Sequence, residues 1–201
     1  MTSPAPPEGT RRRPGGRTAR IRSQVLDALL AELGERGYDG LTVDAVAARA
    51  GVHRATVYRR WSDVGGLLAD ALDAAGDDGW QPPDTGSLRG DLAALNHEIQ
   101  DALTAQPPVV AALIAASFRS EQAEHAQRRL WEDRYARCES IVARAVRRGE
   151  LPPRTDARRL LLAATAPVYH QLVLLRTPAD PDLPDQAART AVLAASAGAF
   201  A

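Results

Sequence analysis

The chain has 201 residues, and its 25 Lys and Arg residues are balanced by 25 Asp and Glu residues, so its formal net charge is +0. This balance excludes a uniformly basic, histone-like protein, although a basic patch remains possible where charges of one sign are segregated. A chain of this length can bury a core without disulfides. Its single cysteine, Cys138, excludes an internal disulfide and any zinc site built from several cysteines.

Residues 1–16 contain four prolines and three glycines and cannot bury apolar surface, so we expect a disordered arm. Arg11, Arg12 and Arg13 make the end of this arm basic. No apolar segment follows these charges, which argues against a secretory signal, and no run of 18 apolar residues predicts a transmembrane helix. The expected location is therefore the cytoplasm.

Three helices are predicted after the arm. Apolar residues recur every four positions over residues 21–33, which predicts a helix with one apolar face. Thr42 can cap a second helix over residues 43–50, and Gly51 permits a sharp turn after it. A third, short helix is expected over residues 54–61, with Val57 and Trp61 sharing its inner face.

The rest of the chain is also predicted to be helical. A fourth helix is expected over residues 63–75, and residues 76–86, GDDGWQPPDTG, form a loop rich in helix breakers. Further apolar stripes predict helices over residues 88–103, 108–118, 131–145, 161–175 and 185–200. Pro167 can kink the helix that contains it, which would either open a cavity or shape a dimer face. The predicted fold class is all-α, without strands.

The charges are segregated along the chain. Residues 1–62 contain 11 arginines and 6 acidic residues, which gives +5, whereas residues 63–201 contain 14 arginines and 19 acidic residues, which gives −5. A basic N-terminal part on an acidic body is typical of a DNA-binding head. We therefore predict a DNA-binding domain over residues 17–62 and a second domain over residues 63–201.

Residues 41–61, LTVDAVAARAGVHRATVYRRW, have the pattern of a helix-turn-helix. Small residues, Ala47, Ala50 and Ala55, lie where two short helices joined at Gly51 must pack closely. The second helix fits the major groove, where arginine reads guanine and hydroxyls hold phosphates. Its outward polar residues are His53, Arg54, Thr56, Tyr58 and Arg59.

This motif resembles the TetR (tetracycline-repressor) family of bacterial transcription regulators. The resemblance is carried by TVDAVA at residues 42–47, AGV at residues 50–52 and ATVYRRW at residues 55–61. It covers roughly residues 17–75, and the C-terminal body is similar in helical layout. The GELP sequence at residues 149–152, followed by Asp156 and a helix holding Pro167, is similar to one C-terminal subclass of that family.

The resemblance implies a homodimeric repressor with a three-helix DNA-binding head and an effector-binding body. Such a regulator binds a pseudo-palindromic operator on double-stranded DNA, and a small-molecule effector releases it by changing the spacing of the heads. Carried over by position, the hydroxyl residues contact the DNA backbone and the arginines contact bases or phosphates. The implied DNA-binding residues are Thr42, His53, Arg54, Thr56, Tyr58 and Arg59.

Two positions depart from the family pattern. His53 stands where the family often has a small polar residue, and its neutral ring could cap the helix or reach a base. Val64 stands where the family often has a phosphate-binding lysine, and Gly65 and Gly66 are expected to loosen the start of the fourth helix. The loss of this phosphate contact should weaken non-specific DNA binding. We hypothesise that the arginines of the arm compensate for the lost contact. This departure leaves open a protein of the same fold that binds a protein partner rather than DNA.

Apolar and aromatic residues of the body could either line an effector cavity or form a packed core, because the two have the same composition. The candidate ligand-binding residues are Ile99, Leu103, Phe118, Trp131, Tyr135, Cys138, Tyr169 and His170. The low aromatic content of 4% favours a small or aliphatic ligand. Segments 155–176 and 185–200 are expected to pair with their symmetry mates in a four-helix dimer interface.

Nothing in the sequence predicts catalysis. His97 and Glu98 with Asp101 lack the second histidine of a helical zinc site, and Cys138 lies within an apolar stripe as a small buried residue. A serine nucleophile elbow, a glycine-rich phosphate loop and a carboxylate pair are all missing. We therefore predict no metal, no cofactor and no enzyme activity. The alternative of an enzyme built on a helical bundle would be favoured by turnover that is lost on substituting His97, His125 or His170.

Overall fold

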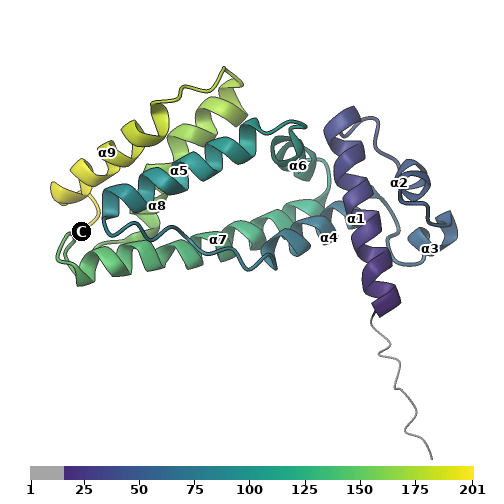
Figure 1. Cartoon of the computed structure of the whole chain (residues 1–201), viewed down its shortest axis with the longest axis horizontal. Coiled ribbons are helices and arrows are strands. Elements are labelled where there is room, and N and C mark those ends of the chain that lie inside the picture. The colour runs from purple at the N-terminus through teal and green to yellow at the C-terminus, as the bar shows by residue number, and fades with distance from the viewer. Residues whose placement is uncertain (1–15) are drawn as a thin grey trace, which may run out of the picture.

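The computed structural model describes residues 16–201, and this part of the chain is helical throughout, without strands, which confirms the predicted fold class (Figure 1). The helices are α1 (Gly16–Arg36), α2 (Val43–Ala50), α3 (Arg54–Tyr58), α4 (Val64–Gly76), α5 (Leu88–Thr104), α6 (Val109–Ser117), α7 (Glu121–Arg147), α8 (Ala157–Tyr169) and α9 (Leu183–Ser196). A π-helical segment, η1 (His170–Leu175), continues from α8. The arm with Arg11, Arg12 and Arg13 lies outside the described residues. None of the described helices is long and apolar enough to cross a membrane.

Local sequence signals determine the helix-turn-helix. The Thr42 hydroxyl caps α2 by accepting a hydrogen bond of 3.1 Å from the amide of Ala45. Gly51 ends α2 with a φ of 64°, a left-handed conformation that glycine adopts without strain. The predicted Thr42 cap and Gly51 turn are therefore both confirmed. α3 is shorter than expected, because the chain tightens after Tyr58 into turns in which the carbonyl of Val57 accepts two amide hydrogen bonds.

Two apolar clusters form the core. The first contains residues of the four helices α1, α2, α3 and α4, of α6 and of the beginning of α7. It includes Leu29, Val46, Val57 and Leu68, all fully buried. The second joins α5, α8 and α9 with the C-terminal half of α7. Figure 1 shows α1, α2 and α3 gathered at one end of the elongated molecule and α9 at the other. Since α6 and α7 share the first cluster, the head packs directly on the body.

The start of α4 is closely packed, so the expectation that its glycines loosen it is wrong. The Asp63 carboxylate caps α4 by accepting a 2.8 Å hydrogen bond from the amide of Gly66. Gly65 is buried, and a Cβ atom at this position would lie 2.3 Å from the hydroxyl oxygen of Ser120. Glycine is therefore needed here because α4 and the start of α7 approach too closely for a side chain.

Pro167 lies inside α8 rather than at its end, and the departure from α geometry follows at His170, where η1 begins. This segment ends at Arg176, whose φ of 54° is a left-handed conformation. The C-terminal helix α9 begins two residues before the predicted position, with Pro184 in its first turn, where a missing amide proton costs no hydrogen bond.

Candidate DNA-binding surface and ligand cavity

The helix-turn-helix presents its predicted polar residues to solvent. Val57 and Trp61 are 0% and 4% exposed, which confirms that they form the inner face of this segment. The residues on the outer face and at the start of α2 are Thr42, His53, Arg54, Tyr58 and Arg59, all exposed, with Thr56 half-buried beside them. The structure therefore brings all six candidate DNA-binding residues to the surface of α2 and α3.

His53 has a defined structural role as the N-cap of α3. Its Nδ1 atom accepts a 3.3 Å hydrogen bond from the amide of Ala55. In a neutral ring with Nδ1 as acceptor, the proton is on Nε2, which is then a donor. The exposed edge of His53 thus offers an N–H group, which suits a phosphate oxygen or an acceptor on a base edge.

Arg49, at the end of α2, ties the helix-turn-helix to α1. Its Nε atom donates to Glu32 at 2.6 Å, and its Nη1 atom donates to Glu35 at 2.9 Å. Glu32 is only 3% exposed, so this contact is largely shielded from water. The hydrogen bond from Arg49 lowers the pKa of Glu35, and the hydrogen bonds that Arg49 donates to the Glu35 and Glu32 carboxylates raise the pKa of Arg49. Arg49 is therefore engaged within the protein.

Asp70, on α4, connects the head to the body and was not identified from the sequence. Its carboxylate accepts hydrogen bonds from Arg22 on α1, at 2.6 Å, and from the indole of Trp61, at 2.9 Å. Partial burial raises the pKa of Asp70, but the hydrogen bonds from Arg22 and Trp61 outweigh it and hold the pKa below its ordinary value. No local spacing links these residues, since Arg22 and Asp70 are 48 positions apart.

A cavity of about 580 Å³ lies within the body, bordered by α4 to α8. This volume lies in the range of sites that hold drug-sized ligands. Six of the predicted ligand-binding residues line it: Ile99, Leu103, Trp131, Tyr135, Cys138 and Tyr169. Burial raises the pKa of the Cys138 thiol to about 11 and also raises the pKa of Tyr169, so both side chains carry their protons at neutral pH.

The other two predicted ligand-binding residues are not in the cavity. Phe118 is 71% exposed at the C-terminal cap of α6, beyond the face of that helix that turns inward. His170 is exposed at the first position of η1, because successive residues on a helix point about 100° apart and Tyr169 takes the inward position. The structure thus corrects these two assignments.

Part of the cavity wall was not predicted from the sequence. α6 contributes Val110, Leu113 and Ile114, and α4 contributes Leu72 and Ala75. The uninterrupted apolar sequence of α6 is a signal of burial, but it does not distinguish a packed helix from a cavity wall. α4 also carries Asp70, so the same helix both lines the cavity and contacts the head.

The cavity wall contains two charged residues, Glu98 and Arg134, and both make hydrogen bonds within the protein. Glu98 accepts a 3.0 Å hydrogen bond from the indole of Trp80. Arg134 donates to Asp78 at 2.5 Å and to the carbonyl of Ala75 at 2.9 Å. Partial burial raises the pKa of Asp78, but the hydrogen bonds from Arg134 and from the amide of Trp80, with the nearby positive charges of Arg134 and Arg137, together outweigh it and lower the pKa. Arg134 is therefore paired with an opposite charge, whereas Glu98, which is exposed, is hydrogen-bonded to the neutral indole of Trp80.

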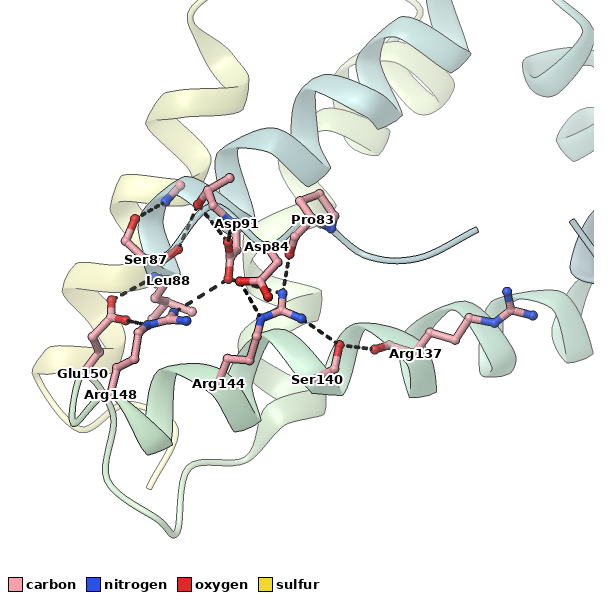
Figure 2. Close-up of polar contacts among 12 residues, drawn as sticks. Pro83, Asp84, Ser87, Leu88, Asp91, Arg137, Ser140, Arg144, Arg148 and Glu150 are labelled. Atoms are coloured by element: carbon pink, nitrogen blue, oxygen red, sulfur yellow. Dashed lines mark hydrogen bonds and ion pairs between the residues drawn. The ribbon is translucent and has the colours of Figure 1, made fainter. Parts of the chain in front are cut away.

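A polar network holds the loop between α4 and α5, which carries Trp80, against the end of α7 (Figure 2). Asp91, fully buried on α5, accepts a 3.3 Å hydrogen bond from Arg144 on α7. Glu150 accepts a 2.8 Å hydrogen bond from the amide of Leu88, the first residue of α5. The glutamate of the GELP sequence thus fastens the beginning of α5 to the segment that follows α7.

The residues considered for a metal site are separated in the structure. The His97 imidazole pairs with Asp185 on α9 at 2.9 Å, whereas Glu98 faces Trp80. Within residues 16–201, no group of three or more histidine, cysteine, aspartate and glutamate side chains is arranged to hold a metal ion.

Comparison with known proteins gives matches over nearly the whole described chain. The family model described as "Bacterial regulatory proteins, tetR family" matches residues 25–71, and "Tetracyclin repressor-like, C-terminal domain" matches residues 82–191. The HTH-type transcriptional regulator AqdR of Rhodococcus erythropolis is 36% identical over 184 residues, which are 90% of this chain and 88% of AqdR. The DNA-binding transcriptional repressor TetR of Mycobacteroides abscessus is 34% identical over 162 residues, covering 79% of this chain and 83% of that protein.

A solved structure shows the same architecture. The crystal structure of the TetR family transcription regulator SCO0332 superposes with a TM-score of 0.66 at 28% sequence identity. The match covers 86% of this chain and 97% of that one. The helix-turn-helix head and the helical body therefore occur together, in this order, in a known regulator fold.

Proposed function

Because the chain belongs to the TetR family of DNA-binding transcription regulators, we propose that it is a repressor that binds its operator as a homodimer and is released by a small-molecule effector. The observation that carries this proposal is the outer face of α3, where polar side chains are exposed while Val57 is fully buried. The proposed division is a DNA-binding head over residues 17–62 and an effector and dimer domain over residues 63–201. The protein acts by binding alone, without catalysis, and on DNA in the cytoplasm.

The proposed DNA contacts follow from the chemistry of the exposed groups. Arg54 and Arg59 supply guanidinium groups for guanine edges or phosphates. Thr42, Thr56 and Tyr58 supply hydroxyls for the DNA backbone, and His53 supplies its Nε2 donor. Arg49 is not a proposed contact, because its guanidinium is engaged with the carboxylates of α1.

The proposed dimer interface is the outer face of α8, η1 and α9, of which α9 reaches the end of the molecule opposite the head (Figure 1). Leu162 on α8 is 42% exposed, Leu174 on η1 is 72% exposed and Leu193 on α9 is 64% exposed. Exposed leucines on adjacent helices are typical of a surface that a partner covers. Self-association of this face in a four-helix arrangement would bury these side chains in both subunits.

The test is selection of DNA from a random duplex library with the purified full chain at several salt concentrations. We expect a palindromic sequence whose affinity falls steeply as salt rises, because each neutralised phosphate releases counterions. A folded, dimeric protein that enriches no sequence would refute DNA reading and favour a protein partner instead. Once an operator is found, effectors are identified by release of the labelled duplex.

Individual contacts are tested with variants on the selected operator. Arg54→Ala should lower affinity by about 1–3 kcal/mol and change the preferred sequence if Arg54 reads a base. If the preferred sequence is unchanged and the salt dependence of binding falls by the equivalent of about one phosphate contact, Arg54 contacts the DNA backbone instead of a base. Arg147→Ala, an exposed arginine near the end of α7, removes the same charge far from the head and should leave DNA binding unchanged.

A further inference from the structure

The cavity meets solvent beside the loop between α4 and α5. Two of its lining residues are exposed on this side, Gln81 in the loop and Glu98 on α5, and Trp80, next to Gln81, is half-buried. The loop runs from the end of α4 along α7 to the start of α5 (Figure 1). A residue that lines the cavity and is also exposed belongs to its rim, so a ligand that enters on this side must pass Trp80.

Trp80 is tied to α5 by its side chain and to α7 by its backbone. The indole N–H donates a 3.0 Å hydrogen bond to the carboxylate of Glu98. On the other side, Arg137 donates a 3.0 Å hydrogen bond to the carbonyl of Trp80, and the Arg134 guanidinium lies 4.7 Å from the centre of the indole ring. The loop is thus fastened to α7, and the hydrogen bond with Glu98 draws the indole across to α5.

The indole can move while the loop stays in place. Because α7 holds the backbone of Trp80, the ring can leave the rim by rotation about its side-chain bonds. Such rotations are fast in side chains near the surface. Glu98 is exposed, so its hydrogen bond with the indole exchanges readily for bonds with water. A contact that rests on one exposed hydrogen bond is suited to reversible closure.

A second hollow, of about 350 Å³, offers an alternative entrance near the exposed Leu174. It shares Trp131, Tyr135 and Tyr169 with the main cavity. Trp131 and Tyr169 meet edge to face, with ring centroids 5.3 Å apart. Passage there requires two packed aromatic rings on different helices to separate, whereas passage at Trp80 requires one exposed hydrogen bond to break. The Trp80 side is therefore the easier entrance.

We propose that Trp80 is the gate of the ligand cavity, closed by the hydrogen bond from its indole to Glu98 and opened by rotation of the indole. This inference rests on the proposed effector function, because the gate sets how fast an effector enters and leaves. Trp80 and Glu98 act here on ligand exchange, whereas the residues of the inner wall act on affinity.

Cys138 reports on the gate because it is the single cysteine of the chain and lines the cavity. It lies one helical turn after Arg134 on α7 and is 5% exposed, within the apolar cluster against which Trp80 packs. A thiol reagent reaches it only in open molecules, so the labelling rate follows the open fraction. The assay is labelling of the DNA-free full-length protein with N-ethylmaleimide, followed by mass spectrometry.

The hydrogen bond is tested from both sides. Glu98→Ala should raise the labelling rate about fivefold, as for the loss of one net hydrogen bond. Glu98→Gln removes the same charge but keeps an acceptor for the indole, so its rate should stay within about twofold of the wild type. Trp80→Phe keeps an aromatic ring and removes the donor, so it should also raise the rate. Adding Glu98→Ala to Trp80→Phe should have no further effect, because both break the same bond.

Two control variants separate gating from other causes. Gln81→Ala, at an exposed position on the same rim, should label at the rate of the wild type. Asp70→Asn breaks the contacts of α4 with Arg22 and Trp61 and leaves the rim intact, so it should also label at that rate. A rise with Asp70→Asn as large as that with Glu98→Ala would show that the reagent reaches Cys138 through general unfolding, which would overturn the proposal.

The proposal is also overturned if Glu98→Ala labels at the rate of the wild type, if Glu98→Gln labels as fast as Glu98→Ala, or if the effects of Trp80→Phe and Glu98→Ala add. The first result would place the entrance elsewhere, with the recess near Leu174 as the alternative. Operator selection is measured separately, so the two proposals can fail independently. The expected labelling rates in a protein that selects no DNA would refute the proposed function alone, and unchanged rates in a protein that selects an operator would refute the gate alone.

Discussion

Asp70 joins α4 to α1 through Arg22 and to the end of the helix-turn-helix through Trp61, with contacts of 2.6 Å and 2.9 Å. Asp70→Asn removes the charge that Arg22 faces while keeping the shape of the side chain. Hydrogen bonds to charged groups stabilise proteins by about 1.5–3 kcal/mol. The side chains of Arg22 and Asp70 are 30% and 21% exposed, so solvent screens part of this interaction and we expect a loss of about 1–2 kcal/mol in unfolding free energy.

The measurement is urea unfolding of the full chain, followed by circular dichroism, and a loss of this size should also lower the Tm by about 2–8 °C. Asp77→Asn is the matched control. Asp77 is exposed at the end of the same helix and, among the described residues, makes no side-chain hydrogen bond or ion pair. It should change the unfolding free energy by less than about 0.5 kcal/mol. Equal effects of the two substitutions would refute the role assigned to the Asp70 contacts.

The same contacts predict a pH dependence. The pKa of Asp70 is lowered in the folded protein, so its stabilising effect is present above the unfolded pKa of about 3.9 and is lost as pH falls through the lower, folded value. The difference between wild type and Asp70→Asn should therefore be constant near neutrality and disappear in acid. A difference that persists after Asp70 is protonated would show that the variant acts by altered packing instead.

Three further outcomes are expected from the geometry. Gly65→Ala should destabilise the protein by about 1–3 kcal/mol in urea unfolding because its Cβ would meet Ser120, whereas Gly66→Ala, whose nearest contact is 3.4 Å away, should be neutral or slightly stabilising. The Cys138 thiol, with its pKa raised to about 11, should react with iodoacetamide at neutral pH on the order of a hundredfold more slowly than after unfolding in urea; equal rates would show that burial does not protect it. Leu193→Arg should convert the proposed dimer to a monomer in analytical ultracentrifugation, and a variant as dimeric as the wild type would place the interface elsewhere.

The features that the sequence predicted well depend on residues close together in the chain. Periodicity located the helices, and the Thr42 cap, the Gly51 turn and the buried positions of Val57 and Trp61 all follow from spacings of a few residues. The chemistry of such local contacts is largely independent of the rest of the fold. The helix-turn-helix was therefore predictable almost residue by residue.

The features that were missed depend on pairs brought together only by the tertiary fold. Arg22 and Asp70 are separated by 48 positions, and Asp91 and Arg144 by 53, so no periodicity connects them. Gly65 was misinterpreted for the same reason, because its neighbour Ser120 belongs to another helix. A glycine at a helix start indicates flexibility when only local propensity is considered and close packing when the partner is known.

Two helices that line the cavity, α4 and α6, also contact the head. This arrangement limits how a ligand could affect DNA binding. α4 lines the cavity with Leu72 and holds Arg22 and Trp61 through Asp70, less than one helical turn away. α6 lines the cavity with Val110, and its start packs against Gly34 of α1, where an added Cβ would lie 3.2 Å from Val109. A close-packed interior transmits displacement instead of absorbing it. A ligand that enlarges the cavity by displacing α4 or α6 would therefore act on α1 and, through Trp61, on the end of the helix-turn-helix.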